Sequence, residues 1–205
     1  MSSRLMPQHD TPNRQWESYV RRGTLDKHSL GSVVVGQYPN GRPIFDTTRT
    51  EIGEALFQLK YRNDYSQVKP LAKAVERQIV PLLGEIGLVI PAPASTVRAR
   101  QPVSELASEV AHRIGVPCFN NLVVKSALVA NAGSLKNLTT KEEKVDALAG
   151  RFVLNKTITN EGRWNTLVVD DLYHTGATLE AVCATLAGYD KIGDIYVAAL
   201  TWRKP

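Results

Sequence analysis

Residues 167–179 read LVVDDLYHTGATL, and this stretch decides the fold class. An apolar run ends in two adjacent carboxylates, Asp170 and Asp171, and a Thr-Gly-x-Thr turn follows at 175–178. A helical pattern begins directly after the turn and continues over 179–186. The order of strand, acidic tip, tight loop and helix N-terminus predicts a strand that leads into a ligand-binding loop.

The turn and the acidic pair suit different parts of one ligand. A loop at a helix N-terminus offers backbone N–H groups and the positive end of the helix dipole to a phosphate. The carboxylates of Asp170 and Asp171 suit hydroxyl groups, or a divalent cation, a few ångströms away. Phosphate next to a polyol implies a sugar phosphate. The alternative is a buried strand that ends in a solvated acidic turn and an ordinary helix cap, and the complete string favours the ligand.

The bulk composition fits one domain of ordinary size. The chain has 205 residues, of which 43% are hydrophobic, and this is enough for a core. Without an apolar run of about 18 residues, or an apolar signal core in residues 1–13, we expect a cytoplasmic protein with no membrane span. Cys118 and Cys183 are expected to be buried thiols, with no disulfide and no zinc site. The net charge of +5 favours polyanions but does not choose between a sugar phosphate and nucleic acid.

Strand and helix patterns alternate over the C-terminal two-thirds of the chain, which implies a mostly parallel sheet with right-handed crossovers. The sequence predicts strands at 32–38, 42–45, 87–90, 116–124, 152–154, 166–169 and 195–200, and helices at 50–59, 68–83, 103–114 and 141–148. A Pro-Asn-Gly turn at 39–41 predicts a hairpin. Residues 1–13 are expected to be disordered, and 14–205 to form a single domain with a hood at about 30–65 and a core at about 66–205.

A second loop, residues 91–102, follows the strand expected at 87–90 and reads PAPASTVRARQP. Its small residues and prolines allow close approach of the backbone, and Arg98 and Arg100 are fork-shaped cations suited to phosphate oxygens. Ligands of parallel sheets bind at the carboxyl ends of strands, so this loop and Asp170 are expected to face one pocket. The alternative is an ordinary strand-to-helix connection, and the nearby motif favours phosphate binding.

These residues resemble the phosphoribosyl-pyrophosphate (PRPP) motif of type I phosphoribosyltransferases, in which apolar residues and two acids precede Thr/Ser-Gly-x-Thr. The resemblance implies the type I phosphoribosyltransferase fold, a mostly parallel five-stranded α/β sheet flanked by helices with a small N-terminal hood. It implies that Asp170 and Asp171 hold the ribose hydroxyls. It assigns the 5′-phosphate to Thr175, Gly176, Ala177 and Thr178, and the pyrophosphate to Ala94, Ser95, Arg98 and Arg100.

A narrower resemblance is to the competence-associated, ComF-like branch of these enzymes, over roughly residues 50–200. It is carried by LKYRNDY at 59–65, IPAP at 90–93, QPVSELA at 101–107, LKN at 135–137 and GRF at 150–152. Two departures stand out. The chain lacks the cysteines of the zinc module with which such proteins often begin, and Gly133-Ser134 stands where a glutamine is often found.

The resemblance implies transfer of ribose 5-phosphate from PRPP to a nitrogenous base, with release of pyrophosphate. Mg²⁺ would be the cofactor, near Asp170 and Asp171 and held through water. His174, directly before the phosphate turn, is a third candidate catalytic residue that could exchange a proton with the base, or a plain solvent-facing residue. Residues 125–140 take the place of the family's mobile loop, or form an ordinary solvated loop.

The sequence leaves two other functions open. One is a non-catalytic PRPP- or nucleotide-binding module that assists DNA uptake, repair or regulation, and the other is a PRPP-family hydrolase or pyrimidine-type regulator. Residues 60–62, Lys-Tyr-Arg, fit the basic end of an exposed helix, or a contact with a base or DNA. The expected partners are PRPP and a nucleobase-like acceptor, with nucleic acid as a weaker alternative; a homodimer is common in the family.

Overall fold

The structure is a computed structural model that describes residues 4–5, 20–94, 96, 98–126 and 151–203. Ser95, the helix expected at 141–148 and residues 127–140 of the expected mobile loop lie outside the described residues. In the described part of the chain, no helix has the length and apolar character needed to cross a membrane.

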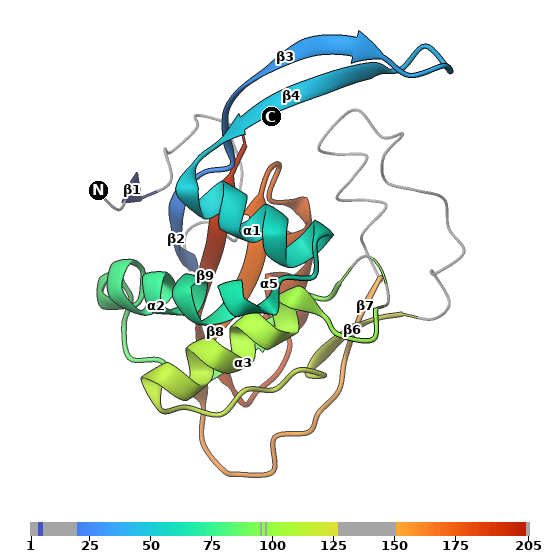
Figure 1. The fold of residues 1–205 in the computed structure, drawn as a ribbon. Coiled ribbons are helices and arrows are strands. Elements are labelled where there is room, and N and C mark those ends of the chain that lie inside the picture. The colour runs from blue at the N-terminus through green and yellow to red at the C-terminus, as the bar shows by residue number, and fades with distance from the viewer. Residues whose placement is uncertain (1–3, 6–19, 95, 97, 127–150, 204–205) are drawn as a thin grey trace.

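A five-stranded sheet forms the centre of the molecule, in the order β1-β2-β9-β8-β5 (Figure 1). Its parallel neighbours are β2 (Val20–Lys27), β9 (Ile192–Trp202), β8 (Trp164–Tyr173) and β5 (Leu88–Pro91). The short strand β1 (Arg4–Leu5) pairs antiparallel with β2, and Val89 forms a parallel bridge with Cys118 at the other edge. The predicted α/β class with a mostly parallel sheet is confirmed.

Helices cover both faces of this sheet (Figure 1). One face carries α1 (Glu51–Tyr61), α2 (Val68–Gln78) and α3 (Pro102–Ile114), and the other carries α5 (Ala177–Ala187). The helices expected at 50–59 and 103–114 are confirmed. The helix expected at 68–83 ends at Gln78, and a 3₁₀ turn, Val80–Leu82, follows, because Pro81 lacks an N–H and disfavours helical geometry in the residue before it.

Two antiparallel pairs lie outside the central sheet. β3 (Ser29–Gln37) and β4 (Pro43–Arg49) form a hairpin that extends beyond the body of the molecule (Figure 1). Its turn is the predicted one, with Gly41 at a φ of 78°. β6 (Val123–Lys125) pairs with β7 (Phe152–Leu154). The strand expected over 116–124 is therefore only partly present.

The N-terminal part of the chain differs from the expectation. β2 joins the central sheet, although its sequence, VRRGTLDK, lacks the alternation of apolar and polar residues by which a half-buried strand is recognised. At Gly23 a Cβ would lie 2.9 Å from a methyl group of Ile79, so this glycine lets the end of α2 pack closely on the strand. Within the segment 1–13 that was expected to be disordered, Arg4–Leu5 forms β1, and the remainder lies outside the described residues.

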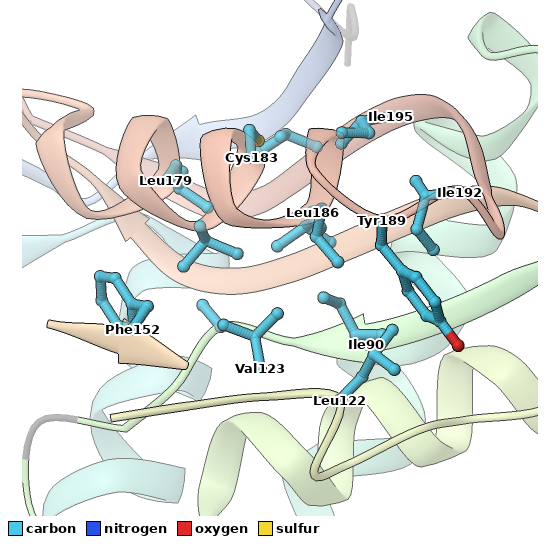
Figure 2. Close-up of a cluster of buried hydrophobic side chains, with 14 of the residues drawn as sticks. Ile90, Leu122, Val123, Phe152, Leu179, Cys183, Leu186, Tyr189, Ile192 and Ile195 are labelled. Carbon is cyan, nitrogen blue, oxygen red and sulfur yellow. The ribbon is translucent and has the colours of Figure 1, made fainter. Parts of the chain in front are cut away.

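The core has two halves that meet at β8. Leu167 and Val169 are fully buried in the half under α1, α2 and α3, whereas Val168 is fully buried in the half under α5. Figure 2 shows the second half, in which Leu179 and Cys183 of α5 point toward the sheet. Both cysteines are free thiols, of which Cys183 is buried as expected, whereas Cys118 is only partly buried. Burial raises the pKa of Cys183 to about 12.

We expect Leu167→Ala to lower the free energy of unfolding by about 2–5 kcal/mol, because it leaves a cavity in a strand that is buried on both faces. Urea denaturation measures the change. The control is Val33→Ala in β3, where the side chain is 62% exposed and we expect a change within about 0.5 kcal/mol. An equal effect of the two substitutions would contradict the central position of β8.

Candidate functional site

The two predicted loops follow the carboxyl ends of two neighbouring parallel strands, β5 and β8. The register pairs Pro91 of β5 with Val169 of β8, and the N–H of Ala92 donates to the carbonyl of Val169 at 2.8 Å. Asp170 is thus the first residue of β8 that extends past the end of β5. The loop after β5 therefore leaves the sheet beside the acidic pair, as the sequence predicts.

β8 does not end at the acidic pair, which is a correction to the expected strand boundary. It continues to Tyr173, because β9 is long enough to pair with it, Leu172 with Thr201 and Tyr173 with Trp202. Successive side chains of a strand point to opposite faces. Asp170 therefore lies on the α5 side of the strand and Asp171 on the side of α1, α2 and α3, so the two carboxylates flank β8.

Asp171 has a partner that was not identified from the sequence. The ammonium of Lys60, in the last turn of α1, donates to Oδ2 of Asp171 and forms an ion pair with it. The two side chains are only 26% and 13% exposed, so water screens the pair weakly. Nη1 of Arg98 donates to the carbonyl of Lys60 at 2.6 Å. Lys60 thus connects the acidic pair to the loop that follows β5.

Burial favours the neutral form of both Asp170 and Lys60. Burial raises the pKa of Asp170 to about 7, although the nearby Lys60 ammonium opposes this shift. Burial lowers the pKa of Lys60, Asp170 opposes that change and Arg98 adds to it. Oδ1 of Asp170 also accepts a hydrogen bond from the N–H of Asp171 at 2.8 Å. A carboxyl group that titrates near neutral pH is a feature of functional sites.

The predicted phosphate turn has the geometry of an anion site. Gly176 precedes α5 with a φ of 78°, and a Cβ there would lie 2.9 Å from the hydroxyl of Tyr173, so glycine is required for two reasons. The cap residue of α5, Gly176, makes no side-chain capping hydrogen bond. The backbone N–H groups of the first turn can therefore serve an anion. Thr175 and Thr178 are partly buried beside it, and His174 is exposed.

The two arginines of the loop at 91–102 have different surroundings. Arg98 is held against the end of α1 by the carbonyl of Lys60. Arg100 instead forms two hydrogen bonds with Glu105 of α3, at 2.9 and 3.1 Å, and its guanidinium lies 3.8 Å above the ring of Tyr65. Ala94 is exposed, in the same loop. Of the two arginines, Arg98 is thus the one that the structure connects to the acidic pair.

Mg²⁺ fits the acidic pair only in part. Among the residues that the structure describes, no group of three or more His, Cys, Asp or Glu is arranged to hold a metal ion. One or two carboxylates are nevertheless sufficient when substrate phosphates and water complete the octahedron, which is the usual arrangement for this ion. Because they lie on opposite sides of β8, Asp170 and Asp171 fit Mg²⁺ singly, as one carboxylate completed by substrate and water, and the Lys60 ammonium already lies on Asp171.

No protein-family model and no curated protein matches the sequence. Among solved structures, it is similar to adenine phosphoribosyltransferase from Leishmania donovani, with 10% identity, a TM-score of 0.46, and coverage of 88% of this chain and 83% of that chain. A second is adenine phosphoribosyltransferase from Thermoanaerobacter pseudethanolicus, with 19% identity, a TM-score of 0.41, and coverage of 84% and 95%. A hypoxanthine phosphoribosyltransferase from Staphylococcus aureus has 14% identity, a TM-score of 0.41, and coverage of 66% and 63%. At such identities, activity has to be argued from the residues of the site.

We expect Asp170→Asn to stabilise the folded chain more as the pH rises. The folded pKa of about 7 lies above the unfolded value of about 3.9, so the stability that this carboxyl contributes is complete below about pH 4 and is lost as the pH rises through 7. The asparagine does not titrate, so its advantage should grow by up to about 3 kcal/mol between about pH 5 and about pH 8. Urea unfolding at both pH values measures it.

The matched control for this prediction is Asp46→Asn, at an exposed position of β4. A difference between wild type and Asp170→Asn that stays constant across this pH range would contradict a raised pKa at Asp170.

Proposed function

We propose that this chain binds PRPP and transfers its ribose 5-phosphate to a nitrogenous base with release of pyrophosphate. The observation that carries the proposal is the meeting of three features at the carboxyl ends of the parallel strands: the N-terminus of α5 with its glycine cap, the acidic pair of β8 and the loop after β5. Each suits one part of PRPP, namely the 5′-phosphate, the ribose and the pyrophosphate.

The 5′-phosphate is assigned to the turn at 175–178. The amides of Gly176, Ala177 and Thr178 lie at the positive end of α5, where an anion is stabilised by about 0.3–1 kcal/mol at exposed sites. The hydroxyls of Thr175 and Thr178 add donors to the same group. The carboxylates stay outside this loop, so they do not repel the phosphate directly.

The ribose is assigned to the acidic pair and the pyrophosphate to the loop at 91–102. Asp170 and Asp171 would accept hydrogen bonds from the ribose hydroxyls where β8 extends past the end of β5. Ala94, Ser95 and Arg98 would meet the pyrophosphate. Arg100, which was predicted to join them, would instead hold the loop in place through Glu105.

The chemistry depends on charge placement. Positive charge develops at the anomeric carbon of the ribose as pyrophosphate leaves, and the site has to orient the sugar and screen the leaving group. Mg²⁺, when bound, supplies additional screening for the pyrophosphate oxygens. Asp170 and Asp171 fix the ribose, and Arg98 stabilises charge on the leaving group. The exposed His174 is the candidate for proton exchange with the acceptor base.

A second candidate is a binding module of the ComF-like kind, which would hold PRPP or a nucleotide without turnover and assist DNA uptake, repair or regulation. The observation that favours it is the engagement of Arg100 with Glu105 and Tyr65, which leaves fewer cations for a departing pyrophosphate. A basic chain with a net charge of +5 also suits nucleic acid. The two candidates share the donor site and differ in turnover.

We expect calorimetry with PRPP and Mg²⁺ to show binding to the wild type. Gly176→Ala should weaken it by about tenfold or more, because a side chain at that φ collides with Tyr173 and distorts the phosphate turn. The matched control is Gly31→Ala in β3, where an added Cβ meets no neighbour within 4 Å. If wild type releases no heat at millimolar PRPP, or if both glycine variants bind equally, the sugar-phosphate assignment is wrong.

Turnover separates the enzyme from the module. Incubation with PRPP and a panel of bases should release pyrophosphate if the chain is a transferase. Tight, strongly salt-dependent binding of single-stranded DNA without pyrophosphate release would support the module instead.

A further inference from the structure

Lys60 has a position that an ordinary surface lysine does not have. Its ammonium is paired with Asp171, its carbonyl accepts from Arg98, and its side chain is about three-quarters buried. Burying an ammonium is costly unless a hydrogen-bonded anion compensates for it. The pairing with Asp171 therefore holds the cation at the acidic pair.

The charge of Asp171 is compensated without any bound ion. The Lys60 ammonium is paired with this carboxylate, and the Arg98 guanidinium, bonded to the Lys60 carbonyl, adds a second positive charge nearby. A divalent cation that approached Asp171 would have to displace the ammonium or share the carboxylate with it. Displacement would leave the partly buried ammonium without its anion. Sharing would place two cations within a few ångströms of each other in a weakly hydrated site, where like charges repel strongly.

We propose that Lys60 is a built-in counter-ion of the acidic pair, which occupies at Asp171 the place that a divalent cation would otherwise take. The inference deepens the proposed function and rests on it in one respect, because the acidic pair is taken as the ribose-binding pair. With PRPP bound, the ammonium is a fixed positive charge between the ribose and the pyrophosphate loop. Donor binding then depends less on Mg²⁺ than it does in a site without this lysine.

The other role that the contacts allow is purely structural, with Lys60 serving only to fasten α1 to β8. Two substitutions separate the roles. Lys60→Met keeps most of the apolar stem and removes the charge, whereas Lys60→Arg keeps the charge. A structural role predicts a change in stability alone, while a counter-ion role predicts a gain of cation binding when the charge is removed.

The experiment is a titration of the ligand-free protein with Mn²⁺, followed by electron paramagnetic resonance of the free ion. Mn²⁺ prefers the same carboxylate and water ligands as Mg²⁺. We expect weak uptake by wild type and by Lys60→Arg, and at least about tenfold tighter binding by Lys60→Met. The double variant Lys60→Met/Asp171→Asn should return to the weak binding of wild type.

Circular dichroism identifies which variants are folded, and Lys60→Gln replaces Lys60→Met if the latter unfolds. Equal Mn²⁺ affinity of the wild type and a folded, charge-free variant would overturn the proposal. So would tighter binding that persists in the double variant, because the gain would then come from another site.

A second arm uses PRPP with and without Mg²⁺. Loss of the Lys60 charge should weaken PRPP binding at least about tenfold in the absence of Mg²⁺, and added Mg²⁺ should restore most of it. An identical loss with and without Mg²⁺ would count against a counter-ion role. If wild type binds no PRPP under either condition, the proposed function fails, while the Mn²⁺ titration still decides the role of Lys60.

Discussion

The pairing of β8 with parallel strands on both of its edges is the constraint on which the rest of the structure depends. Parallel neighbours require crossover connections, and these place helices on both faces of the sheet. Because both faces are covered, β8 has to be apolar on both sides over Leu167–Val169, and its first charged residues can appear only where the ladder with β5 stops. The acidic pair and the loop after β5 are neighbours for this reason.

The same constraint gives the two carboxylates different surroundings. A strand that continues to Tyr173 sends Asp170 and Asp171 to opposite faces, and the two faces carry different neighbours. Asp171 faces α1 and forms an ion pair with the Lys60 ammonium. Among the described residues Asp170 forms no ion pair, and burial raises its pKa to about 7. Two adjacent aspartates thus become one paired carboxylate and one with a pKa raised by burial, because the strand sends them to faces with different neighbours.

The sequence alone predicted those features that depend on local chemistry. The apolar run before Asp170, the glycine at position 176 and the Pro-Asn-Gly turn at 39–41 each restrict the backbone within a few residues, and the structure has them as expected. For residues 60–62 the sequence offers the basic end of an exposed helix, or a contact with a base or DNA. Neither includes the ion pair of Lys60, because its partner lies 111 positions away. β2 was missed for a similar reason: its place in the sheet depends on pairing with β9, at the other end of the chain.

The ends of α1 explain why the Lys60 ammonium behaves as a fixed charge. At its start, Oγ1 of Thr50 accepts from the N–H of Gly53 at 3.0 Å and donates to the carbonyl of Lys27 at 2.7 Å, which ties the helix to the end of β2. Gly53 lies directly against the backbone of His28, so a side chain there would push the helix away from the sheet. An 11-residue helix spans about 16 Å, so an anchored start fixes where its last turn falls. The ammonium reaches Asp171 because the backbone of α1 places it there, so the contacts that anchor the start of α1 also position the ion pair at the acidic pair.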